Sequence, residues 1–142
     1  MVHLTTEEAD KLEAYWIKNK RKYVSTASIQ RNPLFPGYYA DPEILYSEQT
    51  QKYYVYPTTD GIPGWGGTSF KAFSSTDLKT WKEERVVLDL RQVSWAKKNA
   101  WAPCIIEKKQ TDGSYKYYYY YTAEQQIGVA IADHPTGPFV DS

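Results

Sequence analysis

The sequence of this 142-residue chain predicts an all-β fold preceded by a single α-helix. From residue 43 onward, short runs rich in Tyr and Val alternate with clusters of turn residues, which is the pattern of strands and hairpins. The composition agrees, because Tyr and Trp, present 14 and 5 times, favour the half-buried surface of a sheet. Two regions are therefore expected, a helical one over residues 1–31 and a β-rich one over residues 32–142.

The N-terminal region is predicted to hold one amphipathic helix over residues 4–22, followed by a connector over residues 23–31. Thr5 can cap the helix, and Glu8 three residues later completes a capping box. Apolar residues then recur on one face, and basic residues gather in the last turns, where the helix dipole favours cations. We expect this helix to be a structural brace rather than part of an active site.

Seven short strands are predicted in the second region. They cover residues 43–46, 52–56, 69–75, 85–88, 104–108, 116–122 and 128–132. A Gly-rich, irregular loop over residues 58–68 follows the second strand and carries Trp65 near its middle. Long loops of this kind often line a binding site, so Trp65 is a candidate wall residue, and the alternative is that it anchors the loop on the sheet.

The strands form two sets with the same layout. Each set opens with a residue followed by proline, Asp41-Pro42 in the first and Ala102-Pro103 in the second, and continues into an apolar strand and a Tyr-rich strand. The layout recurs after about 60 residues, which is close to the length of one propeller blade. A blade is a four-stranded sheet arranged with others around a central channel. The sequence therefore predicts a β-propeller with about two blades in this chain.

Several function classes are disfavoured by the bulk composition. The chain has 17 basic and 17 acidic residues and no basic stripe, so nucleic acid is not an expected partner. His3 and His134 stand apart without other ligands at metal-binding spacing, so neither a metal site nor a cofactor is expected. No apolar run is long enough for a membrane span, and no membrane partner is expected. Cys104 lies in an apolar run and is expected to be a buried small residue.

One carboxylate stands out, that of Asp41. It follows the aromatic pair Tyr38-Tyr39 and precedes Pro42, which biases Asp41 toward an extended backbone. We expect the two tyrosines to wall the carboxylate on one side. A carboxylate held in such a setting is a candidate acid, base or nucleophile, and the alternative is a turn-forming Asp that stabilises the Pro42 turn.

Four motifs in order resemble those of glycoside hydrolase family 43. They are Tyr39-Ala40-Asp41-Pro42, the segment Ser75–Trp81, Trp101-Ala102-Pro103, and the stretch from Gly128-Val129-Ala130 to Gly137-Pro138-Phe139. The resemblance implies a five-bladed propeller that cleaves arabinose- or xylose-containing polysaccharides with inversion. It also implies that Asp41 is the general base and that Trp101 borders the sugar pocket. Asn99, two residues before Trp101, is a candidate to bind a sugar hydroxyl.

The chain departs from the family in one respect. The family's general acid, a glutamate, and its pKa-tuning aspartate belong to later blades, and Glu107 and Glu124 are better explained as surface or loop residues. Two blades cannot close a ring and would leave open sheet edges. We therefore expect the remaining blades on another chain, or self-association, and no activity from this chain alone.

Three functional interpretations remain open from the sequence. The first is part of an α-L-arabinofuranosidase or β-xylosidase that acts on a pentose-containing oligosaccharide or polysaccharide. The second is a non-catalytic carbohydrate-binding propeller fragment, and the third is a structural propeller that binds proteins. Because enzymes of the first kind act on plant polysaccharides, a secreted or periplasmic location is expected.

Overall fold

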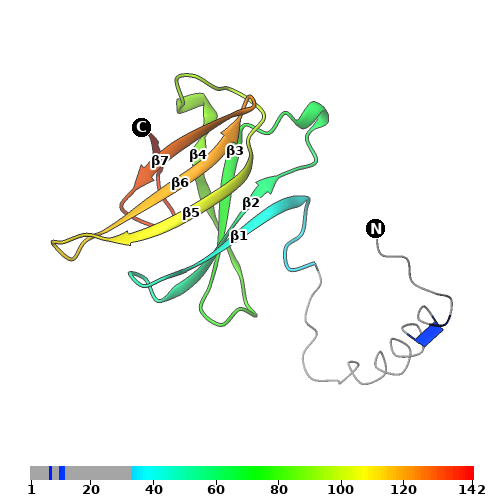
Figure 1. Ribbon diagram of the computed structural model, residues 1–142, viewed down its shortest axis with the longest axis horizontal. Coiled ribbons are helices and arrows are strands. Elements are labelled where there is room, and N and C mark those ends of the chain that lie inside the picture. Colours follow the sequence, from blue (N-terminus) through cyan, green and yellow to red (C-terminus); the bar gives the residue numbers. More distant parts are fainter. Residues whose placement is uncertain (1–6, 8–9, 12–32) are drawn as a thin grey trace. The chain divides into compact units, whose positions relative to one another are not determined.

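The computed structural model describes residues 33–142, together with Glu7, Asp10 and Lys11 (Figure 1). The chain divides into two units, residues 1–31 and 32–142. In the first unit the three described residues are helical, and Lys11 Nζ lies 2.6 Å from Glu7 Oε1. The remainder of the predicted helix over residues 4–22, and the predicted connector over residues 23–31, lie outside the described residues.

The second unit consists of two four-stranded antiparallel sheets (Figure 1). The first sheet contains β1 (Tyr39–Ser47), β2 (Lys52–Thr59), β3 (Ser69–Ser75) and β4 (Lys82–Asp89), in that order. The second contains β5 (Trp101–Lys109), β6 (Tyr115–Ala123), β7 (Gln126–Ala132) and β8 (Val140–Asp141). Two 3₁₀ turns, η1 (Pro63–Trp65) and η2 (Leu90–Gln92), lie in the connections. The all-β prediction and all seven predicted strands are confirmed, and only the two-residue β8 was not predicted.

Aromatic side chains from both sheets form the core between them. On β6 the alternation of a strand buries Tyr117, Tyr119 and Tyr121, each at most 1% exposed. The Tyr119 ring packs edge-to-face on Tyr56 at 5.7 Å and on Phe70 at 5.5 Å between ring centroids. Most of the Tyr-rich run on β6 therefore packs in the core.

The other side of the second sheet is largely apolar and partly exposed. We call it the open face, and it comprises Cys104, Ile106, Tyr118, Tyr120, Ile127, Val129, Ile131 and Val140, which follow from the strand register. Ile127 is 78% exposed, Val140 67% and Ile106 49%. The prediction that Cys104 is buried is wrong, because the alternation turns Pro103 and Ile105 into the core and Cys104 outward.

The segment between β7 and β8 ties the second sheet to the first. Tyr56 Oη donates to Pro135 O at 2.8 Å, and the Phe139 amide donates to Val87 O at 2.9 Å. Arg85 Nη2 donates to Gly137 O at 2.6 Å. The Phe139 ring is only 2% exposed and packs 4.9 Å from Tyr119. Residues 135–139, which include the Gly-Pro-Phe motif, thus clamp the second sheet to the first through both backbone groups and the Phe139 ring.

Asp77 holds the turn between β3 and β4. Its Oδ1 accepts hydrogen bonds from the amides of Thr80 at 2.7 Å and Lys79 at 2.8 Å. These two backbone donors, with Thr80 the stronger, lower the pKa of Asp77 to about 2. The turn leads into Trp81, whose ring packs edge-to-face on Phe35 with the ring centroids 5.6 Å apart.

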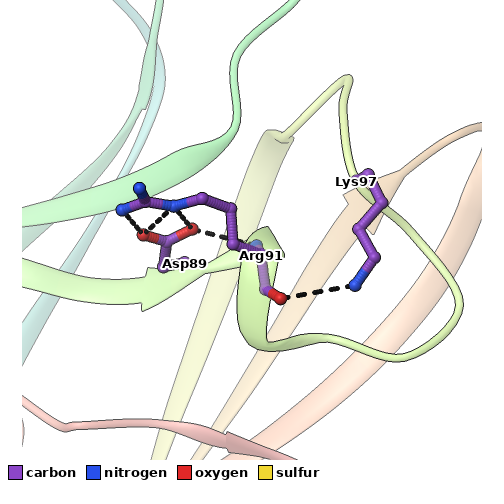
Figure 2. Close-up of polar contacts among 3 residues, drawn as sticks. All are labelled: Asp89, Arg91 and Lys97. Atoms are coloured by element: carbon purple, nitrogen blue, oxygen red, sulfur yellow. Dashed lines mark hydrogen bonds and ion pairs between the residues drawn. The ribbon is translucent and has the colours of Figure 1, made fainter.

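A capped turn shapes the connection between the two sheets (Figure 2). The Asp89 carboxylate accepts from the Arg91 amide at 2.9 Å and pairs with the Arg91 guanidinium, whose hydrogen bonds lower the pKa of Asp89. Lys97 Nζ donates to Arg91 O at 3.3 Å, so it holds the far side of the same turn. This connection leads directly into Ala100 and Trp101.

Candidate functional site

A cavity of about 470 Å³ opens where β1, β2, β5 and the Gly-rich loop meet. Its lining residues are Asp41, Thr58, Thr59, Asp60, Ile62, Trp65, Gly67, Ala100, Trp101 and Ala102. It thus brings together three of the four side chains that the sequence singles out, those of Asp41, Trp65 and Trp101. These residues come from positions up to 60 apart in the chain, so the fold and not local sequence creates the cavity.

Asp41 reaches the cavity from a β-bulge. The register of β1 with β2 shifts between Ala40 and Glu43, which leaves Asp41 and Pro42 without strand partners. Asp41 has φ 45°, in the left-handed region, so the expectation of an extended backbone is wrong. The bulge overrides the bias from Pro42, and Asp is one of the few residue types that adopt this conformation readily. The bulge turns the side chain away from the sheet and into the cavity.

The second sheet contains the same bulge. The register of β5 with β6 shifts between Trp101 and Cys104, and Ala102, which also precedes a proline, has φ 45°. Ala102 is therefore the counterpart of Asp41, and both line the cavity. The predicted repeat is visible here at the level of single residues.

Two tryptophans form the aromatic part of the cavity wall. The rings of Trp65 and Trp101 meet edge-to-face with their centroids 6.0 Å apart. Trp65 is 77% exposed, so its indole face is available to a ligand. Flat indole surfaces beside a carboxylate suit a molecule with both CH faces and hydroxyl groups, such as a sugar.

Tyr38 and Tyr39 do not line this cavity, contrary to the sequence expectation. The Tyr39 ring packs edge-to-face on Phe73 at 5.2 Å, and Tyr38 lies against Gly61. The aromatic walls come instead from the Gly-rich loop and from β5. Sequence proximity to Asp41 was misleading because the bulge at Asp41 and Pro42 interrupts the alternation that would otherwise place Tyr39 and Asp41 on the same face of β1.

Asn99 supports the cavity from outside it. Its Nδ2 donates to Trp65 O at 2.9 Å, and the neighbouring Ala100 amide donates to Gly67 O at 2.8 Å. Asn99 is not one of the lining residues, so its amide serves the loop rather than facing the cavity. Gly67 suits this crossing, since a Cβ there would be crowded at 3.2 Å from Ala100 O and 3.3 Å from Thr59 O.

Replacing Asn99 with Gly is expected to loosen the loop that carries Trp65. Gly tolerates the left-handed backbone of Asn99 (φ 57°), so the variant removes the amide without adding backbone strain. The near-ultraviolet circular dichroism of the Trp65–Trp101 pair should weaken, while the free energy of unfolding changes by about 1 kcal/mol. Gln110→Ala is the control, because it removes a similar bond from Nε2 to Lys108 O (3.0 Å) in the β5–β6 turn. An unchanged Trp signal in Asn99→Gly would show that the amide does not hold the loop.

The sequence interpretation missed polar cavity residues on β2. Thr58 Oγ1 donates to Asp41 Oδ2 at 3.2 Å and accepts from the Ala102 amide at 2.7 Å. Thr59 Oγ1 is buried in the cavity lining and has no hydrogen-bond partner within the described part of the chain. Asp60, immediately after β2, adds a second carboxylate. One signal was available, since β2 pairs directly with the strand that carries Asp41.

The two glutamates considered as acids lie elsewhere. Glu107 Oε2 accepts from Tyr117 Oη at 2.5 Å and its Oε1 from the Glu48 amide at 2.7 Å. Burial and the hydrogen bond to Glu107 raise the pKa of Tyr117. Glu124 Oε1 accepts from the Lys97 amide at 3.0 Å. Both carboxylates therefore have structural partners, and neither lines the cavity.

Among the described residues, no group of three or more His, Cys, Asp or Glu side chains is arranged to hold a metal ion. Within the same residues, no helix has the length and apolar character needed to cross a membrane. The cavity itself presents carboxylates, hydroxyls and indole rings.

Comparison with known proteins identifies relatives of this chain in sequence and in structure. A β-D-galactofuranosidase of Aspergillus niger, xynD, is 34% identical over 120 residues, which cover 78% of this chain and 34% of that protein. A xylosidase/arabinosidase of Bacteroides ovatus is 30% identical, over 78% of this chain and 37% of that protein. The structure of the GH43_1 enzyme of Xanthomonas citri complexed with xylose superposes with a TM-score of 0.62 at 28% identity, over 77% of this chain and 33% of that one.

The chain spans about a third of the length of these relatives. The two four-stranded sheets correspond to two blades of a β-propeller, as the similarity to the Xanthomonas citri enzyme indicates. The family model described as glycosyl hydrolases family 43 matches residues 30–142, which include both sheets and every residue of the cavity. The chain belongs to glycosyl hydrolase family 43.

Proposed function

We propose that residues 33–142 supply the base side of the active site of an inverting glycosidase, with Asp41 as the general base. The substrates are arabinose- or xylose-containing glycans, and the activity is that of an α-L-arabinofuranosidase or β-xylosidase. One observation carries the proposal. The Asp41 carboxylate opens into a cavity walled by Trp65 and Trp101, where a sugar ring can stack while a carboxylate approaches it.

The geometry of Asp41 suits a base that activates water. Its Oδ2 accepts from Thr58, whereas Oδ1 receives no hydrogen bond from any residue in the described ranges. Oδ1 can therefore accept a proton from a water molecule as the water oxygen attacks the anomeric carbon. The bond to the leaving oxygen breaks at the same time, and a second carboxyl group donates its proton to that oxygen.

This second carboxyl group is proposed to come from another sheet of the ring. An inverting pair stands about 6.5–9.5 Å apart so that the water fits between. In the described part of the chain, Asp60 is the other carboxylate of the cavity, and it sits in the loop immediately beside β2. We assign Asp60 to sugar hydroxyls, since an acid must approach the glycosidic oxygen from the face opposite the base.

The open face of the second sheet supports the same proposal. Ile106, Ile127 and Val140 are exposed there, and most of the residues between them on this face, such as Val129 and Ile131, are apolar as well. Large exposed apolar faces mark surfaces that pack against something. We propose that a further propeller sheet covers this face, on the same polypeptide, on another chain or in a second copy. We use the term complete enzyme for the propeller with these sheets in place.

The test of the proposed function is hydrolysis by the complete enzyme. Aryl α-L-arabinofuranoside, aryl β-D-xyloside and, because of the Aspergillus relative, aryl β-D-galactofuranoside are the substrates. Proton NMR during the first turnovers should show the sugar released with inverted configuration at the anomeric carbon. Retained configuration would exclude Asp41 as a base that activates water. Binding of xylose or arabinose without any hydrolysis would favour a non-catalytic carbohydrate-binding propeller.

The 142-residue chain by itself is expected to be inactive on the same substrates. Protonation of the leaving oxygen needs an acid, and no glutamate lines the cavity within the described residues. The measurement is release of the aryl group by the chain after light scattering has established its oligomeric state. Turnover by a monomer would show that a carboxyl group of this chain, most directly Asp60, serves as the acid.

A further inference from the structure

We propose that Thr58 is a positioning residue for Asp41 and that it couples the carboxylate to the second sheet. The inference rests on the proposed role of Asp41 as base. Thr58 lies near the end of β2, opposite Ala40 in the register, and is only 4% exposed. Its hydroxyl touches the bulges of both sheets, since it contacts Asp41 on β1 and Ala102 on β5.

The hydrogen-bond chemistry fixes the direction of this contact. The Ala102 amide can only donate, so Thr58 Oγ1 must accept from it, at 2.7 Å. The single hydroxyl proton of Thr58 is then directed to Asp41 Oδ2, at 3.2 Å. A carboxylate oxygen without a proton is the acceptor that this proton needs. Thr58 therefore acts as a donor toward Asp41 and does not compete with it as an acceptor.

The contact also orients the carboxylate. Asp41 stands on an exposed bulge, where its side chain could otherwise rotate freely, and the buried Thr58 hydroxyl anchors one of its two oxygens. The other oxygen, Oδ1, receives no hydrogen bond from the residues that the structure describes. Because the anchor is itself held by the Ala102 amide, a displacement of β5 relative to β2 would move the carboxylate. Thr58 thus makes the position of the base depend on the packing of the two sheets.

The first test measures the contact in the 142-residue chain, without any need for activity. Thr58→Val keeps the shape of the side chain but removes the acceptor for the Ala102 amide. Hydrogen exchange of that amide, followed by NMR, should accelerate in Thr58→Val and stay near wild type in Thr58→Ser. Thr122→Val is the matched control, because Thr122 pairs with Trp101 beside the second bulge as Thr58 pairs with Ala40. Unchanged exchange in Thr58→Val would overturn the proposal.

The second test measures catalysis in the complete enzyme. Hydrogen bonds to charged groups are among the stronger ones, so Thr58→Val is expected to lower kcat by about 10- to 100-fold. KM should change little, because Thr58 acts on the base and not on the bound sugar. Thr58→Ser should recover most of kcat. A purely structural role for Thr58 would instead give a lower unfolding midpoint with kcat unchanged, and that result would overturn the proposal.

A double substitution separates this inference from the proposed function. In an Asp41→Asn background, Thr58→Val should cause no further loss of kcat, because the group it positions is no longer a base. Full activity of Asp41→Asn would refute the proposed function itself. Loss of activity in Asp41→Asn together with an additive loss from Thr58→Val would leave the function standing and refute the positioning role.

Discussion

Replacing Asp41 with Asn is expected to lower kcat of the complete enzyme by about 10²- to 10⁴-fold, the range typical of general acid–base catalysis. The amide keeps the size of the carboxylate and can still accept from Thr58 Oγ1, but it cannot take a proton from water. The affinity for xylose or arabinose should survive, because the walls formed by Trp65 and Trp101 are unchanged. Steady-state kinetics and quenching of Trp fluorescence by the sugar measure the two quantities.

The control for this prediction is Asp133→Asn. It makes the same chemical change at an exposed carboxylate whose contact is a surface ion pair with Lys116 (2.6 Å), and such pairs contribute little. Loss of sugar binding together with activity in Asp41→Asn would indicate that Asp41 holds the substrate or the bulge. Wild-type kcat in that variant would exclude its role as base.

Phe139→Ala is expected to lower the free energy of unfolding of the 142-residue chain by about 3–5 kcal/mol. The ring is 2% exposed and fills the space beside Tyr119, so its removal leaves a cavity between the two sheets. The substitution would weaken the attachment of residues 135–139 to the first sheet, because the Phe139 amide also donates a hydrogen bond to Val87 O. Urea denaturation followed by Trp fluorescence measures the change.

Val140→Ala provides the comparison. Val140 follows Phe139 directly but is 67% exposed, so its substitution should change the free energy of unfolding by about 0.5 kcal/mol or less. If the Ala variant does not fold, Phe139→Leu can be measured in its place, and it should lower the free energy of unfolding by less than the Ala substitution. Equal effects at positions 139 and 140 would mean that the segment does not clamp the sheets.

The strands could be predicted from the sequence because their signals are local. Tyr-rich and apolar runs bounded by turn residues mark β1 to β7, and the Asp77 turn follows from side-chain-to-backbone chemistry within four residues. The strand β8 has two residues and follows Gly137 and Pro138, so it carries no period that could reveal it. Cys104 shows the same limit, since its exposure depends on which residue of an apolar run begins the alternation.

The sequence alone indicated Asp41, Trp65 and Trp101, whose side chains carry their own chemistry; the structure brings them to one cavity, and their functional roles stay predictions. Thr58 was not predicted, because its contacts depend on the strand register and on the packing of two sheets, and the residues around it reveal neither. Asn99 shows a third case. Its position beside Trp101 suggested a ligand contact, and the fold uses its amide to hold the loop instead.

The repeated bulge gives this cavity an internal pseudosymmetry. Asp41 and Ala102 occupy equivalent backbone positions in consecutive sheets, and both face the same space. One position carries an ionisable carboxylate and the other a methyl group. The two sheets therefore present the same local bulge with different chemistry, and the difference lies in a single side chain of the repeated unit.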